Sequence, residues 1–179
     1  MAAGVRRYDP ERRQRIIDAA IRVVGAKGIA GLSHRSVAAE ADVPLGSTTY
    51  HFKTLDDLLV AALRQANEAY APAWAPRAGE GLAGALARLL GELLAAAGRG
   101  RAELEYELYL AALRRPALRP VAAEWLESVT GALAEHTDPV TARALVAVMD
   151  GISLQVLLTG ADYDEPYARE VLGRVLRSV

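Results

Sequence analysis

The sequence contains no cysteine and only one phenylalanine among its 179 residues. Without cysteine the chain forms neither disulfides nor thiolate metal sites, and it needs no oxidising compartment. Its three histidines lack the Glu-x-x-His spacing of a di-iron helical bundle. No Ser/His/Asp arrangement and no phosphate-binding glycine loop is present either. The sequence therefore predicts no metal site, no cofactor and no enzymatic activity.

Long apolar runs are also missing at the sequence level. No stretch reaches the ~18 to 20 apolar residues that a membrane-spanning helix needs. Arginines occur within Met1–Tyr8, but the apolar core of a secretory signal does not follow them. We therefore expect a cytoplasmic protein that does not enter a membrane.

Alanine and leucine dominate the sequence instead, with 36 and 25 copies. These unbranched side chains lose little rotamer freedom in a helix, and no long alternating run of Val, Ile and Thr indicates a strand. The sequence predicts an all-α fold of about nine helices.

The charges are unevenly distributed along the chain. Residues 1–53 carry nine Arg and Lys against five Asp and Glu, a net charge of +4, whereas residues 54–179 carry twelve against seventeen, a net charge of −5. Such a split indicates that the N-terminal part meets phosphate groups. An excess of solvated arginines is the alternative explanation.

Four helices are expected before residue 71. Ser33 can cap the second helix, and Thr54 with Asp57 forms a near capping box for the fourth. The second and third helices are too short to be stable alone, so the first and fourth must hold them. The expected ranges are 9–27, 33–41, 44–51 and 55–70.

Five more helices follow a segment rich in proline and glycine at 71–81. We expect two domains, 1–54 and 55–179, with the seam in this segment or in the helix just before it. Residues 140–159 leave almost no polar face, which predicts homodimerisation through the last two helices. The alternative is that these helices form only the core of their own domain. The expected ranges are 82–98, 102–115, 118–136, 140–159 and 165–177.

Residues 33–51 have the composition of a helix-turn-helix. Ala38, Ala39 and Ala41 permit close approach of two helices, and Pro44 ends the turn between them. The second of these helices offers hydroxyl and imidazole groups, which bond phosphate oxygens or base edges. These groups belong to Ser47, Thr48, Thr49, Tyr50 and His51.

The segment Arg15–Leu63 resembles the tetracycline-repressor (TetR) family of bacterial regulators. It reads RIIDAAIRVVGAKGIAGLSHRSVAAEADVPLGSTTYHFKTLDDLLVAAL. Its most specific part is Tyr50–Lys53, followed by an acidic, leucine-rich helix start. Beyond Leu63 the similarity is architectural, since the family has about five further helices and dimerises through the last two.

The resemblance implies a sequence-specific DNA-binding regulator, most often a repressor. Two positions depart from the family pattern: Asp42 stands where the family usually has glycine, and Leu55 where it often has lysine. Asp42 implies a left-handed turn residue at some energetic cost. Leu55 implies one phosphate contact fewer, which lowers the salt dependence of log K by ~0.9. The residues that the family pattern assigns to DNA are Arg35, Gly46, Ser47, Thr48, Thr49, Tyr50, His51 and Lys53.

The family's larger domain holds a small-molecule pocket, whose occupation alters the spacing of the two DNA-reading heads. The aromatic, thioether and amide side chains of residues 55–179 suggest a mostly apolar or aromatic effector. The candidates for its contacts are Trp74, Tyr106, Tyr109, Trp125, Met149 and Gln155. A helical adaptor that binds proteins and not DNA is the remaining alternative. It explains the apolar C-terminal helices but requires neither the Tyr50–Lys53 motif nor a basic N-terminal third.

Overall fold

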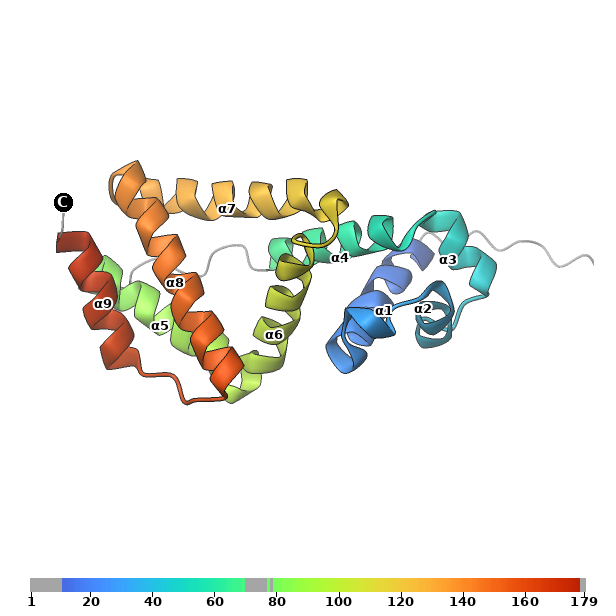
Figure 1. The fold of residues 1–179 in the computed structure, drawn as a ribbon, viewed down its shortest axis with the longest axis horizontal. Coiled ribbons are helices and arrows are strands. Elements are labelled where there is room, and N and C mark those ends of the chain that lie inside the picture. The colour runs from blue at the N-terminus through green and yellow to red at the C-terminus, as the bar shows by residue number, and fades with distance from the viewer. Residues whose placement is uncertain (1–10, 70–76, 78, 178–179) are drawn as a thin grey trace, which may run out of the picture. The chain divides into compact units, whose positions relative to one another are not determined.

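The computed structural model describes residues 11–69, 77 and 79–177 (Figure 1). In these residues the chain forms nine α-helices and two short 3-10 turns, and no strand. The expected all-α fold is confirmed. The helices are α1 (Arg12–Lys27), α2 (His34–Glu40), α3 (Leu45–His51), α4 (Leu55–Ala69), α5 (Leu82–Leu94), α6 (Ala96–Ala111), α7 (Arg119–Ala134), α8 (Pro139–Thr159) and α9 (Glu165–Arg177); the 3-10 turns are Ile29–Gly31 and Pro116–Leu118.

The chain divides into two compact units, Met1–Ala62 (unit 1) and Leu63–Val179 (unit 2). The division falls inside α4, later than the expected boundary at residue 54 and earlier than the proline-rich segment. Leu58 and Leu59, in the first half of α4, are fully buried and belong to unit 1. One uninterrupted helix therefore supplies side chains to both units, and no linker sequence marks the change.

Unit 1 is built on local hydrogen bonds at its helix ends. The Ser36 backbone donates a hydrogen bond to the Ser33 hydroxyl, and the Ser33 backbone donates one to the Ser36 hydroxyl, so the expected Ser33 cap of α2 is confirmed. Helix α2 packs on both α1 and α3. The turn between α2 and α3 contains Asp42 at φ +52°, the one positive-φ residue other than glycine in the described chain.

Helix α4 starts with a complete capping box. The Asp57 backbone donates to the Thr54 hydroxyl at 3.1 Å, and the Thr54 backbone donates to the Asp57 carboxylate at 2.9 Å. The hydrogen bond from the Thr54 backbone holds the pKa of Asp57 below its usual value. This reciprocal cap fixes where α4 begins, directly after α3 and its loop.

Unit 2 packs α5 along α9 and α7 along α8, with α8 also against α5, α6 and α9 (Figure 1). Its core contains fully buried leucines from four of these helices. Helices α5 and α6 meet at a corner at Ala95. A Cβ on Gly98 would lie 2.5 Å from the Leu93 carbonyl oxygen, so only glycine fits this corner. The core leucines include Leu86, Leu90, Leu133, Leu145 and Leu172.

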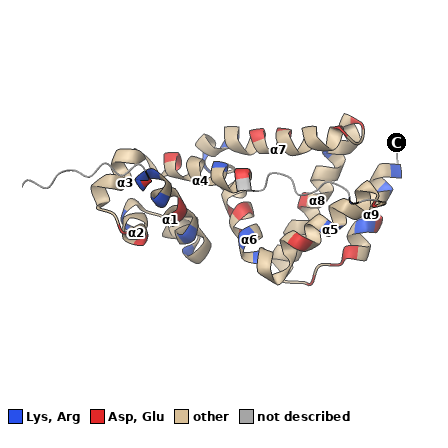
Figure 2. Ribbon diagram, turned by 180° about the vertical axis from the view of Figure 1, so that it is seen from behind, with Lys and Arg blue, Asp and Glu red and all other residues tan. Residues whose placement is uncertain are grey.

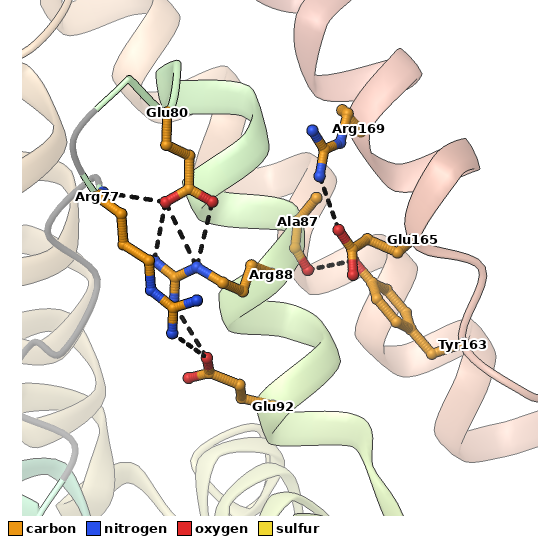
Figure 3. Close-up of polar contacts among 8 residues, drawn as sticks. All are labelled: Arg77, Glu80, Ala87, Arg88, Glu92, Tyr163, Glu165 and Arg169. Carbon is orange, nitrogen blue, oxygen red and sulfur yellow. Dashed lines mark hydrogen bonds and ion pairs between the residues drawn. The ribbon is translucent and has the colours of Figure 1, made fainter.

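The start of α5 is held by a cluster of ion pairs (Figure 3). Arg88, whose side chain is 14% exposed, lies 3.2 Å from the Glu80 carboxylate and 3.0 Å from that of Glu92. The Arg77 backbone also donates to Glu80. The hydrogen bond from Arg88 holds the pKa of Glu80 below its usual value. The cluster thus fixes the segment before α5 to the helix itself.

The loop between α8 and α9 is fastened to the same helix. The Tyr163 hydroxyl donates to the carbonyl oxygen of Ala87 (Figure 3), and burial raises the pKa of Tyr163. The Tyr163 ring also lies against Gly91, where an added Cβ would come within 3.1 Å of it. This contact supports the long packing of α9 along α5.

Helix α8 corrects one expectation. At 21 residues it is long and apolar enough to cross a membrane by length and composition, although no such stretch was expected from the sequence. In the structure α8 packs against α5, α6, α7 and α9, and core helices of soluble proteins pass the same test, so the finding is weak evidence for a membrane.

Candidate DNA interface and ligand cavity

The turn between α2 and α3 is compact. The Val43 backbone donates to the Ala38 carbonyl at 3.0 Å, and the Ser47 backbone donates to the Pro44 carbonyl at 2.8 Å. Buried Ala38 and Ala41 allow the two helices to approach. The result is the two-helix arrangement of a helix-turn-helix, as the sequence predicted.

One side of α3 is exposed to solvent. Tyr50 is 82% exposed, and its ring meets the His51 ring edge-on at 5.1 Å between centroids. Arg35 on α2 and Lys53 after α3 are also exposed. Most of the residues assigned to DNA are thus accessible, and their contacts stay a prediction. Of the other assigned residues, Gly46 and Thr49 are exposed, whereas Ser47 and His51 are half-buried.

Thr48 is the exception and corrects the assigned set. Its side chain is fully buried, and its hydroxyl donates to the Leu45 carbonyl at 2.8 Å. The helical spacing explains the error, because the exposed side of a seven-residue helix cannot include every polar residue. Thr48 holds α3 onto unit 1 and does not face DNA.

Cationic side chains gather on α1 (Figure 2). The Arg13 guanidinium lies 5.1 Å from the centroid of the Phe52 ring, a cation–π contact. Phe52 is 3% exposed and belongs to the core. Arg22 pairs with Glu40 of α2 at 2.7 Å. Part of the basic excess of unit 1 is therefore structural and does not count toward DNA binding.

Unit 2 contains a cavity of about 400 Å³. Helix α5 supplies an apolar wall, and α4, α6, α7 and α8 supply the remaining sides. This volume suits a molecule of drug size. The apolar wall consists of Leu86, Leu89, Leu90 and Leu93.

Four of the predicted effector contacts line this cavity: Tyr106, Tyr109, Trp125 and Met149. Gln155 does not. It is exposed, because it lies six residues after Met149 and six residues turn a helix by about 240°, to the opposite side. Trp74 lies outside the described residues.

No acidic side chain is among the predicted effector contacts, yet carboxylates line the cavity. Asp150 is one of them, and its carboxylate accepts a hydrogen bond from the Tyr106 hydroxyl at 3.0 Å. Burial raises the pKa of Asp150 and also that of Glu105, where the Arg101 side chain opposes the rise. The pKa of Tyr109 is raised by burial and by the charge of Asp150.

Two further carboxylates, Glu68 and Glu124, line the cavity. Glu124 is neutralised by Arg64 through two hydrogen bonds of 2.7 and 3.1 Å. Asp150 has no basic residue within ion-pair distance among the described residues. The cavity therefore combines aromatic rings with a half-buried carboxyl group whose charge is not compensated.

Ser153 completes the polar part of the wall. Its side chain is fully buried, and its hydroxyl has no hydrogen-bond partner in the described structure. It follows Met149 by four residues and Asp150 by three, so all three share one face of α8. That spacing is the signal that identifies Ser153 from the sequence once Asp150 is recognised as a cavity residue.

These two units define the class of protein. An exposed helix-turn-helix in one unit and a ligand-sized cavity in the other are the parts of a ligand-responsive, DNA-binding transcriptional regulator. Two family models match the chain: bacterial regulatory proteins of the tetR family over residues 16–62, and the tetracyclin repressor-like C-terminal domain over residues 77–178. The chain belongs to the TetR family, whose members are generally non-enzymatic transcription factors. This sets the adaptor alternative aside.

Solved structures show the same fold over nearly the whole chain. The multidrug binding protein EbrR complexed with imidazole is 71% identical, with a TM-score of 0.84 over 94% of this chain and 96% of that one. The EbrR complex with ethidium is 73% identical, with a TM-score of 0.84 over 93% and 99%. Other EbrR structures contain proflavin and malachite green. A TetR-family member from Streptomyces coelicolor A3, SCO1917, is 72% identical, with a TM-score of 0.83 over 93% and 99%.

A more distant relative is similar over a short stretch. The HTH-type transcriptional regulator PksA of Bacillus subtilis (strain 168) is 38% identical over 58 residues. This match spans 32% of this chain and 28% of PksA, so it carries nothing about effectors.

Proposed function

We propose that this protein is a cytoplasmic repressor that binds its operator as a homodimer and releases it when an aromatic organic cation occupies the cavity of unit 2. The observation that carries the proposal is the uncompensated carboxyl group of Asp150 among the aromatic side chains of this cavity. The cavity binds its ligand and does not transform it.

The aromatic side chains favour flat, polarisable ligands. Tyr106 and Tyr109 enter the cavity from α6, and Trp125 from α7. Aromatic rings stack on one another and attract cations to their faces. A planar cation therefore gains from both effects in the same site, whereas an aliphatic ligand gains from neither.

The charge of the ligand follows from Asp150. A partly buried carboxylate without a positive partner is costly, and burial accordingly raises the pKa of Asp150. A cationic ligand supplies the missing charge. Ethidium and malachite green are aromatic cations, and proflavin is an aromatic base that takes up a proton. The EbrR complexes with these dyes therefore support the same ligand class here.

Helix α4 offers a route from the cavity to the DNA-binding unit. Its second half lines the cavity with Leu63, Asn67 and Glu68, and its first half supplies Leu58 and Leu59 to unit 1. A ligand that contacts the second half acts on a helix continuous with the DNA-binding unit. We infer that occupation of the cavity shifts the population of α4 positions away from the one that fits the operator.

Dimerisation through α8 and α9 is supported by an apolar stripe on α8 that the chain itself does not cover. Val140 and Leu158, at its two ends, are 77% and 81% exposed. Gly151, in the middle, has open space where a Cβ would be, which leaves room for the helix of a second protomer. The stripe consists of Val140, Ala144, Ala147, Val148, Gly151, Leu154 and Leu158, none of them fully buried.

The effector proposal is tested by titrating ethidium into the protein without DNA and following dye fluorescence. Asp150→Asn keeps the acceptor for Tyr106 and removes the charge, so we expect dye affinity to fall about 10-fold or more. Glu127→Gln, at an exposed acid of α7 outside the cavity, is the matched control and leaves affinity unchanged. Equal dye affinity for wild type and Asp150→Asn contradicts the proposal.

Release of the operator needs a separate comparison because ethidium also intercalates into DNA. The wild type and Asp150→Asn are compared on the same labelled operator at the same dye concentration. Intercalation acts equally on both, so a dye concentration that releases only the wild type demonstrates a cavity-dependent response. Release of both proteins at the same concentration assigns the effect to the DNA and contradicts the proposal.

The dimer is tested by Leu158→Glu, which places a carboxylate in the stripe of each protomer. We expect dissociation to rise at least about 100-fold, measured by sedimentation, because two charges would be buried together. Leu113→Glu in the turn after α6, where the leucine is 72% exposed, is the control. An unaltered dimer in Leu158→Glu places the interface elsewhere.

A further inference from the structure

The exposed side of α3 carries unusual chemistry for a helix that reads DNA. Four residues form this side: Leu45, Gly46, Thr49 and Tyr50. Their spacing of one, four and five residues places them on one face. Among the described residues of unit 1, the only large apolar side chains classed as exposed are Leu45, at 47%, and Tyr50, at 82%. Both lie on this face.

No residue of this face has the polar fork that identifies a base by two hydrogen bonds. Arg and Lys pair with guanine, Asn and Gln with adenine, and Asp and Glu with cytosine. None of these six residue types occurs between Leu45 and His51. The Thr49 hydroxyl donates to the Gly46 carbonyl at 3.3 Å, so its proton is already used. Sequence recognition by α3 must therefore depend on other contacts.

Leu45 has no structural reason to be exposed. The other leucines of unit 1 in well-packed positions, Leu32, Leu58 and Leu59, are at most 7% exposed. A leucine side chain that becomes buried gains about 1.5 to 3 kcal/mol over one left in water. In the free protein about half of the Leu45 side chain stays in water, so about half of this free energy is not gained. Contact with an apolar group of a partner would bury the exposed half.

We propose that Leu45 identifies a thymine in each operator half-site through the C5-methyl group of that base. This methyl is the one apolar group that base pairs present in the major groove. The inference rests on DNA binding through α3. It adds the chemical basis by which this chain distinguishes one sequence from another: contact of Leu45 with a methyl group in place of paired hydrogen bonds.

The experiment uses the full-length dimer and an operator located by footprinting upstream of its own gene. Each thymine is replaced singly by deoxyuridine, which removes the methyl and keeps every hydrogen-bonding group. We expect one position in each half-site to weaken binding about fourfold, and both together about 15-fold. Fluorescence anisotropy on labelled duplexes measures these changes.

The Leu45→Ala variant, combined with the deoxyuridine replacement, completes a double-mutant cycle between the side chain and the methyl group. It binds the natural operator more weakly than wild type, and it loses the difference between thymine and deoxyuridine at the sensitive position, because the partner of the methyl is gone. Leu113→Ala, at an exposed leucine in the turn after α6, keeps that difference. Circular dichroism confirms that each variant is folded.

Three results would overturn the inference, and they are distinguishable. Salt-dependent binding that is equal for thymine and deoxyuridine at every position removes the role of Leu45 and leaves DNA binding intact, as does sensitivity that persists in Leu45→Ala. Absence of duplex binding at any salt concentration overturns DNA binding itself and the inference with it.

Discussion

Unit 1 and unit 2 place their functional groups in opposite ways. In unit 1 the candidate side chains are exposed: Tyr50 is 82% accessible, and Lys53 is also open to solvent. In unit 2 the candidate groups are withdrawn from water, as with fully buried Ser153 and half-buried Asp150. A surface that binds a polyanion is recognised by what it exposes. A ligand cavity is recognised by buried polar groups that the protein leaves uncompensated.

The electrostatics of the two units differ in the same sense. Within residues 11–62, the described part of unit 1, the one shifted pKa belongs to a helix cap, where the Thr54 hydrogen bond lowers the pKa of Asp57. In the cavity of unit 2 burial raises the pKa values of Glu105, Tyr109 and Asp150. The charged groups of unit 1 therefore act in water and those of the unit 2 cavity in a partly dry site, so salt should mainly affect DNA binding and pH should mainly affect ligand binding.

The largest expected effect is loss of DNA binding in Tyr50→Ala combined with Lys53→Ala. Both side chains are exposed, so the fold does not depend on them. Each change occurs twice in a dimer and removes a phosphate or sugar contact each time. We expect at least about a 100-fold loss of operator affinity and a smaller salt slope, measured by anisotropy between 50 and 200 mM salt.

The same double variant tests whether the two units function independently of each other. Ethidium affinity in the absence of DNA should equal that of wild type, and sedimentation should show an intact dimer. A double variant that still shifts the operator at the wild-type concentration would show that these two residues are wrongly assigned. A variant that also loses dye binding would show that the units are not functionally separable.

The second largest expected effect is a dependence of ethidium affinity on pH. Because burial raises the pKa of Asp150, part of the protein carries the neutral acid at pH values where aspartate is normally charged. A permanent cation such as ethidium favours the charged form, so its affinity rises with pH, by up to about tenfold per pH unit below the pKa. Asp150→Asn removes this dependence. The titratable or charged groups that share the cavity are Arg64, Glu68, Glu105, Tyr106, Tyr109 and Glu124.

Glu105 is the control for this prediction, since burial raises its pKa as well. Fluorescence titrations from about pH 5 to 7.5 in wild type, Asp150→Asn and Glu105→Gln assign the dependence to one carboxyl group. An ethidium affinity that stays constant with pH in wild type shows that Asp150 does not change its proton on binding.

Sequence patterns were sufficient for the all-α fold and for the two helices of the helix-turn-helix, whereas the DNA contacts assigned to them stay a prediction. Capping chemistry fixes the start of α2 after Ser33 and of α4 after Thr54 because these interactions are local. The break between α5 and α6 was misplaced, since Gly98 looked like a helix end and is instead the residue that fits the corner. Close approach to the Leu93 carbonyl depends on tertiary geometry, which no local pattern contains.

Only part of the cavity lining could be predicted from the sequence, again because the remainder depends on tertiary packing. Its aromatic residues are conspicuous in the sequence, and four of the six candidates line it. Its polar residues depend on helix phase and on neighbours far along the chain: Tyr106 and Asp150 are 44 positions apart. The same limit explains Thr48, which looks available as a polar residue on a reading helix and is buried.

The third expected effect is on the stability of the folded protein. Asp150→Asn should raise this stability, although it lowers the affinity for ethidium. The folded-state pKa of Asp150 is raised, so its stabilising contribution is present below the unfolded pKa and is lost as pH rises through the folded pKa. At neutral pH its charge therefore destabilises the empty cavity. Asp150→Asn, which weakens ethidium binding, should raise the melting temperature at pH 7.5 by about 2 to 4 °C for each kcal/mol removed.

Calorimetry at two pH values tests this sign. The difference between Asp150→Asn and wild type should shrink as pH falls, because a growing fraction of the wild-type carboxyl group is then neutral. A variant that is less stable than wild type at pH 7.5 would mean that Asp150 stabilises the fold through its hydrogen bond with Tyr106. It would contradict the role of Asp150 as a destabilising charge that binds a cationic ligand.

The smallest effect belongs to unit 1 and comes from the turn that positions α3. Asp42 adopts φ +52°, a conformation that glycine adopts without steric cost. Asp42→Gly should stabilise the protein by about 0.5 to 1 kcal/mol, less the entropy that glycine adds to the unfolded chain. Asp42→Ala should destabilise it, because alanine has neither this freedom nor a side chain that hydrogen-bonds locally.

Asp42→Asn separates the backbone of this turn from its charge. Asparagine tolerates the left-handed conformation as aspartate does and lacks the negative charge. A stability gain found in Asp42→Gly and absent from Asp42→Asn comes from the backbone, whereas tighter operator binding shared by both comes from the removed carboxylate near the DNA-reading helix. Equal melting temperatures for Asp42→Gly and Asp42→Ala would mean that this turn carries no strain. The operator affinity of unit 1 would then depend on its exposed side chains and not on the conformation of the turn that presents them.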